Sequence, residues 1–436
     1  SVLRAKREWK LVTMAQILDD CFAFGDDLMP TDEALAILDQ RLSPVVGVET
    51  APLRRAHGRI LAEEVTAECF VPPHDNAAVD GYAVYFDDLG LKAETLLPVT
   101  ARIAAGHPLD HAPRRGEALR IFTGAPIPGD ENTPGPDTVL MQEDCREQDG
   151  KVAIPPGISR GANLRQKGED MKPDDMVLQQ GRRLLPQDIG LAASLGLTGL
   201  SVYEPLSVAV FSSGDEICEP GEKLSSGALY DANRYGLFAL LEGLGCVVTD
   251  LGILPDDEAI ITEALAGAAP GHGLILTSGG VSTGEEDHIR AAVEALGSLH
   301  FWRLSIKPGR PLAMGQVGTT PFIGLPGNPV AVMVTFLRFA RPAILRLSGV
   351  VDHQPVLFRV RAGFSQKKKA GRREWVRARL VQGPSGEPVA EKFPRQGSGI
   401  LSSMVAADGL VELAEDASHV SEGDMVDFLS FREVLS

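Results

Sequence analysis

The sequence contains few cysteines, few aromatic side chains and no long apolar segment. Its five cysteines are scattered, odd in number and never arranged as Cys-x-x-Cys, which argues against a structural zinc site and a disulfide framework. Buried apolar thiols in a reducing cytosol are the expectation for all five. No apolar run reaches the ~18 residues of a membrane span. Residues 1–10 are basic but lack an apolar stretch, so we expect no secretory signal.

The charge of the chain is strongly negative, at −17 for 436 residues. Nucleic-acid binding needs a basic surface, so this charge argues against it, although it is compatible with one local basic pocket for a small anion. The 46 glycines and 30 prolines indicate many defined turns. The length is sufficient for several domains with large cores.

The hydrophobic pattern changes along the chain and divides it into regions. Residues 1–30 form an extension of weak helical character. A helix begins near Thr31, its expected N-cap, and residues 71–165 contain short β-type runs between Gly/Pro turns. Residues 166–205 mix turns with one helix that begins at Pro186.

The second half of the chain begins with alternating strands and helices at residues 206–348, which predicts a mostly parallel sheet covered on both faces. Asn233 is the expected cap of one of these helices, and residues 329–347 form a long helix. Residues 355–436 return to β patterning without a convincing helix, which indicates a small barrel. The predicted fold class is therefore multidomain α/β.

Glycine-rich turns follow several predicted strands of the α/β region. In residues 211–217, Ser212 and Ser213 offer hydroxyls, Gly214 permits a tight turn and Glu216 follows within an acidic pair. These carboxylates would repel a bare phosphate, so a divalent cation is their expected partner. The alternative is an acidic helix N-terminus stabilised by the helix dipole.

The turn at residues 277–287 repeats this pattern after a neighbouring strand. It supplies hydroxyls, glycines and a terminal carboxylate, namely Ser278, Gly279, Gly280, Ser282 and Asp287. It matches neither the dinucleotide nor the P-loop pattern. Backbone N–H groups at strand ends bind anions in α/β sheets, so the turn predicts a ligand site, with a capped helix as the alternative.

Two further turns supply cations and rigid prolines. Arg303 and Lys307 point to the same side of an extended segment, and a solvated face is the alternative for them. Residues 324–329 contain Pro326 and Pro329 in a specialised conformation, with a purely structural turn as the alternative.

Two motifs stand out in the β region. Residues 72–84 place Asp80 before a Gly-Tyr pair, and residues 123–128 form a rigid turn that carries the hydroxyl of Thr123. Taken singly, each is more often a turn than a site.

Together these segments resemble the MoeA family, the molybdopterin molybdenumtransferases, which are related to the E domain of gephyrin. The resemblance is carried by DNAAVDGYAV (75–84), TGAPIP (123–128), GANLRQKGED (161–170), SSGDEI (212–217), SGGVSTGEEDH (278–288), KPGRP (307–311) and LPGNPV (325–330). The chain departs from the family at Ala77, where serine is frequent, at Arg303, where lysine is common, and in a lengthened turn at residues 130–136.

The resemblance implies a fold and an assembly. It implies a helical linker or dimerisation domain from residues 31–70 and 166–205, an inserted β domain at 71–165, a MogA-like α/β domain at 206–348 and a C-terminal β-barrel at 355–436. It also implies a homodimer whose cleft combines the α/β domain of one subunit with the inserted domain of the other.

The resemblance further implies a cytoplasmic enzyme that inserts molybdenum. Its substrates are adenylylated molybdopterin and molybdate, AMP is released, and Mg²⁺ assists. A MogA-type adenylyltransferase and apo molybdoenzymes are the implied partners. The alternatives are a non-catalytic molybdopterin-binding or scaffolding paralogue and a generic nucleotide-dependent transferase.

Site residues are carried over motif by motif. The implied catalytic residues are Asp80, Thr123, Glu216, Asp256, Asp287 and Lys307, of which Glu216 and Asp287 are the expected metal ligands. The resemblance also implies Pro326, Pro329 and Ser398 as binding residues, and the motif chemistry above adds Ser213, Gly214, Ser278, Gly279, Gly280, Ser282 and Arg303. Because molybdate is an oxyanion, we expect Arg303 and Lys307 to bind it, with Ser398 as a further donor.

Overall fold

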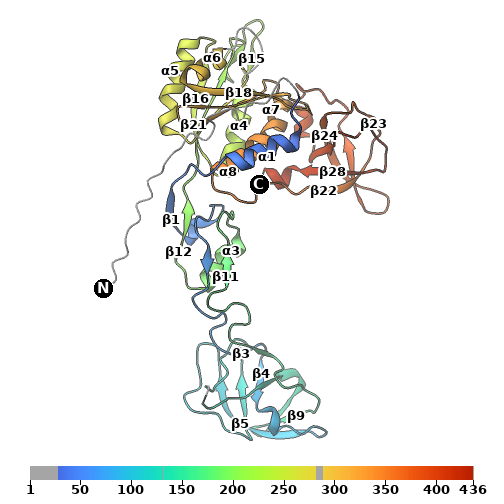
Figure 1. Ribbon diagram of the computed structural model, residues 1–436. Coiled ribbons are helices and arrows are strands. Elements are labelled where there is room, and N and C mark those ends of the chain that lie inside the picture. The colour runs from blue at the N-terminus through green and yellow to red at the C-terminus, as the bar shows by residue number, and fades with distance from the viewer. Residues whose placement is uncertain (1–27, 131, 281–287, 436) are drawn as a thin grey trace, which may run out of the picture. The chain divides into compact units, whose positions relative to one another are not determined.

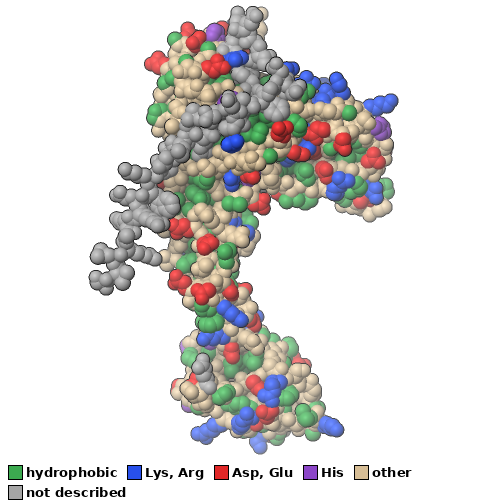
Figure 2. Space-filling model, in the orientation of Figure 1, with side chains coloured by type: hydrophobic (Ala, Val, Ile, Leu, Met, Phe, Trp, Pro, Cys, Tyr) green, Lys and Arg blue, Asp and Glu red, His purple; other side chains and the backbone are tan. Residues whose placement is uncertain are grey.

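The computed structural model describes residues 28–130, 132–280 and 288–435, and it divides into two compact units (Figure 1). The smaller unit consists of Glu64–Gln179 and Pro186–Thr198, and the larger unit contains the other described residues. Among the described helices, none is long and apolar enough to cross a membrane. On the face drawn in Figure 2, acidic and basic side chains are intermingled over each unit.

The centre of the larger unit is a six-stranded sheet with the strand order β16-β13-β17-β21-β20-β18. Its strands are β13 (Ser207–Ser213), β16 (Val247–Leu254), β17 (Leu274–Ser278), β18 (Gly297–Arg303), β20 (Pro311–Val317) and β21 (Thr320–Leu325). The sheet is mostly parallel, as expected, but β20 and β18 form an antiparallel edge. The short turn between β20 and β21 explains this edge, because so short a connection can join only antiparallel strands.

Helices cover both faces of this sheet (Figure 1). One face carries α5 (Glu258–Ala268), the 3-10 turn Ala269–Gly271 and α6 (His288–Leu296). The other face carries α4 (Ala232–Gly243), α7 (Pro329–Thr335) and α8 (Arg341–Leu347). The helix α1 (Thr31–Arg41) packs on α8. Successive strand residues point to opposite faces. Val208 and Val210 therefore enter one core, while Ala209 and Phe211 enter the other.

The structure corrects both expected helix caps. The N-cap of α1 is Pro30, and the buried hydroxyl of Thr31 has no hydrogen-bond partner. The N-cap of α4 is Asp231, whose carboxylate accepts a hydrogen bond from the backbone N–H of Arg234 at 3.1 Å. Asn233 lies inside the first turn of α4 instead. Where several polar residues adjoin a helix start, the sequence does not distinguish which one caps it.

The long helix expected after the last glycine-rich turn is confirmed. It consists of α7, a π-helical segment at Phe336–Ala340 and α8, which follow one another directly.

A closed barrel of five strands follows this helix. Its strands are β22 (Phe358–Ala362), β24 (Arg373–Gln382), β25 (Pro388–Lys392), β26 (Gly409–Leu413) and β28 (Met425–Ser430). The short strand β19 (Ile306–Lys307) pairs in parallel with β24. The expectation of no helix in this region is wrong, because α9 (Ser402–Val405) and α10 (Phe431–Val434) each form a single turn. One turn is too short to show apolar periodicity in a sequence.

Short elements complete the larger unit. They are the pairs β1 (Val48–Pro52) with β12 (Gly199–Tyr203), β14 (Ile217–Cys218) with β15 (Leu229–Tyr230) and β23 (Gln366–Lys367) with β27 (His419–Val420), together with α2 (Leu53–Ala56).

The smaller unit is built around a six-stranded sheet with the order β7-β4-β6-β5-β9-β8. These strands are β4 (Gly81–Val84), β5 (Thr95–Ile103), β6 (Ala118–Ile121), β7 (Thr138–Met141), β8 (Arg146–Gln148) and β9 (Lys151–Ile154). Around them lie the pairs β2 (Val65–Thr66) with β11 (Met176–Leu178) and β3 (Asn76–Ala77) with β10 (Leu164–Arg165), 3-10 turns at Phe86–Asp88 and Gln142–Asp144, and α3 (Pro186–Ser194). The predicted β patterning and the helix start at Pro186 are confirmed.

Candidate functional site

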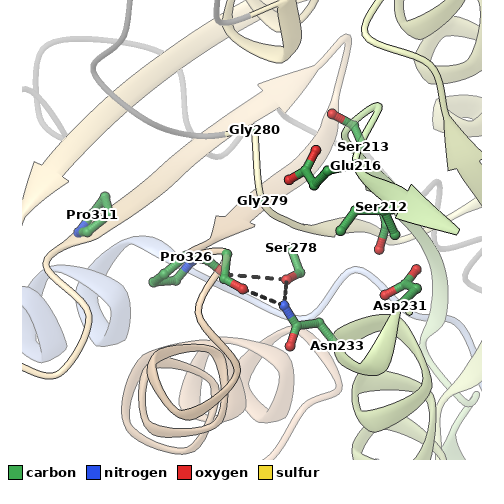
Figure 3. A pocket seen from close by; sticks show the side chains of 12 residues that line it. Ser212, Ser213, Glu216, Asp231, Asn233, Ser278, Gly279, Gly280, Pro311 and Pro326 are labelled. Atoms are coloured by element: carbon green, nitrogen blue, oxygen red, sulfur yellow. Dashed lines mark hydrogen bonds between the residues drawn. The ribbon is translucent and has the colours of Figure 1, made fainter. Parts of the chain in front are cut away.

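A pocket of about 270 Å³ lies in the larger unit, where β13, β17 and β21 end. It is lined by Ser212, Ser213, Glu216, Ile217, Asp231, Asn233, Ser278, Gly279, Gly280, Pro311, Pro326 and Gly327 (Figure 3). The turns that begin after β13, β17 and β21, all singled out from the sequence, thus meet at one edge of the sheet. Serine hydroxyls, glycine backbone and carboxylates therefore line the same pocket, as expected for a ligand site at strand ends.

The turn after β13 places two serines and a glutamate in the pocket. The hydroxyl of Ser212 is buried and has no hydrogen-bond partner, while Ser213 Oγ donates to Asp256 Oδ1 at 2.9 Å. Gly214 has a φ of +140°, and a Cβ there would lie 2.4 Å from Glu216 Oε2. Glycine is therefore required for Glu216 to fold back over its own turn.

The turn after β17 also depends on glycine. Gly280 has a φ of +63°, and a Cβ there would lie 2.4 Å from Ile289 Cδ1 and 3.0 Å from Ser213 Oγ. Gly279 donates its N–H to the carbonyl of Leu325 at 3.1 Å, which fixes this turn to β21. Two predicted site residues of the same turn, Ser282 and Asp287, lie outside the described residues.

Asn233 connects three elements at the floor of the pocket, a role that we did not predict. Its Nδ2 donates to Ser278 Oγ at 2.9 Å and to the carbonyl of Gly327 at 2.7 Å. Ser278 Oγ in turn donates to the carbonyl of Pro326 at 3.3 Å (Figure 3). The only signal in the sequence was a polar residue at a helix start, which also fits an ordinary cap.

A buried arginine supports the pocket wall behind Asp231. Arg234 is 2% exposed and forms ion pairs with Asp231 at 2.9 Å, with Asp250 and with Glu219. Burial alone would lower the pKa of Arg234, but its hydrogen bonds to Asp231 and Asp250 outweigh that effect and raise it. One guanidinium therefore pairs with three carboxylates from separate segments and ties those segments together.

Replacing Arg234 with Met should destabilise the protein by about 3 kcal/mol, because removing one partner of a buried ion pair leaves the others uncompensated. Thermal or urea unfolding of the full chain measures this loss. Arg290→Met removes an exposed arginine that pairs with Glu294 on α6, and such pairs contribute about 0.5 kcal/mol. Equal stability losses in the two variants would contradict the role assigned to Arg234.

Lys307 is anchored to the barrel rather than lining the pocket. Its Nζ donates to Glu374 Oε2 at 3.3 Å, and the parallel pairing of β19 and β24 places the two residues in register. Glu374 is 2% exposed and also accepts from Arg372 Nε at 2.8 Å. Arg303 is exposed, and its register partner Pro311 lines the pocket.

The last predicted residues of the larger unit meet at the N-terminus of α7. Pro329 is the first residue of this helix, and Val330 donates its N–H to the carbonyl of Ser398 at 2.9 Å. The segment around Ser398 is also bound by Arg377, which is buried and donates to the carbonyl of Gly397 at 2.9 Å. Ser398 therefore lies beside the Pro326–Pro329 turn.

Asp80 and Thr123 form a second polar group in the smaller unit. Asp80 Oδ1 accepts from the backbone N–H of Thr123 at 2.8 Å and from its Oγ1 at 2.7 Å. These two hydrogen bonds lower the pKa of Asp80 below its usual value, and the bond from the backbone N–H has the larger effect. The pair thus presents an ionised carboxylate next to a positioned hydroxyl.

The oxygen donors of the pocket suit a hard divalent cation. The carboxylate of Glu216 and the hydroxyls of Ser212 and Ser213 line the pocket, and Asp256 adjoins it through its hydrogen bond with Ser213. These oxygens are the ligand types that Mg²⁺ accepts, and Mg²⁺ commonly binds few protein ligands and keeps several waters. Within the described residues, no group of three or more His, Cys, Asp or Glu side chains forms a ready metal cage. The donor set therefore fits Mg²⁺ shared with a substrate.

Three sequence models of protein families match the chain. They describe the MoeA N-terminal region (domain I and II) at residues 29–196, a probable molybdopterin binding domain at 209–346 and the MoeA C-terminal region (domain IV) at 359–431.

Relatives extend along nearly the whole chain. A molybdopterin molybdenumtransferase of Haemophilus influenzae is 37% identical over 410 residues, covering 94% of this chain and 100% of the relative. A molybdopterin molybdenumtransferase of a Nostoc species is 33% identical over 86% of this chain and 87% of its own length. The crystal structure of the molybdopterin biosynthesis MoeA protein from Pyrococcus horikoshii superposes with a TM-score of 0.79 at 29% identity, covering 93% of this chain and 100% of that one. The chain therefore belongs to the MoeA family of molybdopterin molybdenumtransferases.

Proposed function

We propose that this protein inserts molybdenum from molybdate into adenylylated molybdopterin, with release of AMP, at a late step of molybdenum cofactor biosynthesis. The observation that carries this proposal is the pocket at the ends of β13, β17 and β21. All its lining residues lie within the range that matches a probable molybdopterin binding domain, and they combine hydroxyls, glycine turns and the carboxylates of Glu216 and Asp231.

The residues of the larger unit divide into two roles under this proposal. Ser212, Ser213 and Ser278 hydrogen-bond the substrate, since Ser212 in particular has a buried hydroxyl without a partner. Arg303 and Lys307 attract the oxyanion molybdate, because Lys307 keeps 49% of its side chain exposed while it is anchored by Glu374. Fixed cations stabilise charge that develops on oxygen during phosphate cleavage.

Glu216, with Asp287 as its expected companion, would hold Mg²⁺, and Asp256 fixes the adjacent hydroxyl of Ser213. Bound there, Mg²⁺ would neutralise the negative charge of the phosphate oxygens while the adenylate is cleaved. Gly280 lets its turn approach Ser213 of the neighbouring turn, and Gly214 lets Glu216 fold back over its own turn.

We further propose that the protein works as a cytoplasmic homodimer. Asp80 and Thr123 belong to a separate compact unit from the pocket, and in the proposed assembly the cleft takes them from the second subunit. A MogA-type adenylyltransferase supplies the substrate, and apo molybdoenzymes receive the product.

Reconstitution tests the proposed function. Purified full-length protein is mixed with adenylylated molybdopterin, molybdate and Mg²⁺, and both AMP release and activation of an apo molybdoenzyme are measured. We expect both signals, and we expect both to be lost when Mg²⁺ is chelated. Tight molybdopterin binding without AMP release would instead support a non-catalytic paralogue, and hydrolysis of free ATP would support a generic nucleotide-dependent transferase.

A further inference from the structure

One arginine of the smaller unit contacts every segment that builds the Asp80–Thr123 pair. Arg120 lies in β6, and its Nη1 donates to the carbonyl of Gly81 at 3.3 Å. Its Nη2 donates to Gln142 Oε1. Its guanidinium carbon lies 5.0 Å from the ring centroid of Tyr82 and 5.0 Å from that of Phe122. These contacts fix the guanidinium on several sides.

Each of these contacts adjoins the pair directly. Gly81 follows Asp80 in the chain, and Phe122 precedes Thr123. Gln142 donates its backbone N–H to the carbonyl of Asp80 at 3.0 Å. Three strand ends, those of β4, β6 and β7, are therefore linked by the same side chain immediately beside the two residues that form the pair.

The geometry requires arginine in particular. The planar fork of a guanidinium donates in two directions while its faces stack on aromatic rings, and a lysine ammonium cannot do both. One of the stacked rings is itself held in place, because Tyr82 OH donates to Glu147 Oε2 at 2.6 Å. Burial and this hydrogen bond raise the pKa of Tyr82 to about 12, so the ring stays neutral and keeps its donor.

Arg120 also acts on Asp80 through its charge. Alongside the two hydrogen bonds from Thr123, the positive charge of Arg120 contributes to lowering the pKa of Asp80. A fixed cation close to a carboxylate favours its ionised form. Arg120 thus adds a small charge effect at Asp80 to the contacts by which it holds the neighbouring backbone.

We infer that Arg120 is a positioning residue for the proposed reaction: it holds Asp80 and Thr123 in their reactive arrangement and does not itself need to touch the substrate. This inference rests on the proposed function of Asp80. The alternative is that Arg120 only stabilises the local fold. The two roles differ in whether replacing Arg120 changes the reaction rate only when Asp80 is present.

A double-mutant cycle separates the two roles. AMP release is measured in single-turnover experiments with the full-length wild type, R120Q, D80N and the double variant R120Q/D80N. Small displacements of a reacting group can cost about 100-fold in rate, so we expect R120Q to slow the reaction by roughly 10- to 100-fold with little change in KM. In the D80N background, R120Q should change the rate by less than about twofold, since coupled residues are not additive.

Arg102→Gln is the matched control. Arg102 pairs with Arg120 across β5 and β6 and stacks over the same Phe122 ring at 4.4 Å. It contacts neither Gly81 nor Gln142, so its loss should leave the rate near that of the wild type. Arg120→Lys retains the positive charge and serves as a second variant in case R120Q does not fold. Its rate of AMP release should lie between those of the wild type and R120Q, and this difference should also disappear in the D80N background.

The outcomes are distinct from those that test the function itself. A wild type that releases no AMP would contradict the proposed function. A wild type and an R120Q variant that release AMP at the same rate would contradict only the role of Arg120. Full additivity of R120Q and D80N, or an equal loss in Arg102→Gln, would also overturn that role.

Discussion

Replacing Asp80 with Asn should reduce the rate of AMP release by about 10²- to 10⁴-fold, the range typical of losing a charged group that acts on the reacting atoms. The amide side chain of the D80N variant would keep an oxygen that accepts from Thr123 N and Oγ1, so the local fold should persist. Only the charge is lost. Single-turnover AMP release at fixed Mg²⁺, together with thermal unfolding, separates the catalytic loss from instability.

The pKa of Asp80 in the wild type sets how the difference between wild type and D80N depends on pH. Since the hydrogen bonds from Thr123 lower that pKa, the carboxylate is ionised at every pH above the usual aspartate range. The stability that these bonds provide is present above the unfolded-state pKa and is lost only as the pH falls through the lower folded-state value. We therefore expect the ratio of wild-type to D80N rates to stay constant between about pH 6 and 8.

Asp110→Asn is the control for this prediction. It removes the same charge from the same unit at a side chain that is 95% exposed and pairs with the neighbouring His111. Its rate should equal that of the wild type. A D80N rate within a few-fold of the Asp110→Asn rate would show that Asp80 takes no part in the reaction.

Asp80 was assigned through the resemblance of residues 75–84 to the MoeA family, and one residue of that motif has a clear structural reason. Asp80 precedes Gly81, where a Cβ would lie 1.6 Å from the carbonyl of Leu140, so no other residue fits between β4 and β7. Such local requirements for glycine are visible in a sequence. The apolar runs of β13 and β17 were equally visible, because both strands are buried on both faces.

Long-range pairs could not be predicted in this way. Lys307 and Glu374 are 67 residues apart, and Arg234 reaches Asp250 across 16 residues. Charged residues are frequent and their partners follow only from the folded register, so no spacing rule connects them. The role of Asn233 was missed for a related reason. Its side-chain amide donates to Ser278 and Gly327, which lie in two turns that only the fold brings next to it.

Replacing Glu216 with Gln should reduce the rate of AMP release by about 10²- to 10³-fold and raise the Mg²⁺ concentration needed for half-maximal rate. The substitution keeps the size of a side chain that lines the pocket but removes the charge expected to hold the cation. A Mg²⁺ titration of the rate measures both effects. Glu222→Gln, in the exposed segment that follows, is the control and should match the wild type. An unchanged Mg²⁺ requirement in E216Q would assign the cation to other ligands.

Mixing the two inactive variants extends this prediction to the proposed dimer. Asp80 and Glu216 lie in separate units of one chain. If each cleft combines units from two subunits, a hybrid of D80N and E216Q contains one cleft with both substitutions and one with neither. Subunit exchange should then restore up to about a quarter of the wild-type rate, because random pairing makes half the dimers hybrid and each hybrid has one intact cleft. If the cleft lies within one subunit, every cleft retains a substitution and mixing restores nothing, so the recovered rate decides which chain supplies Asp80.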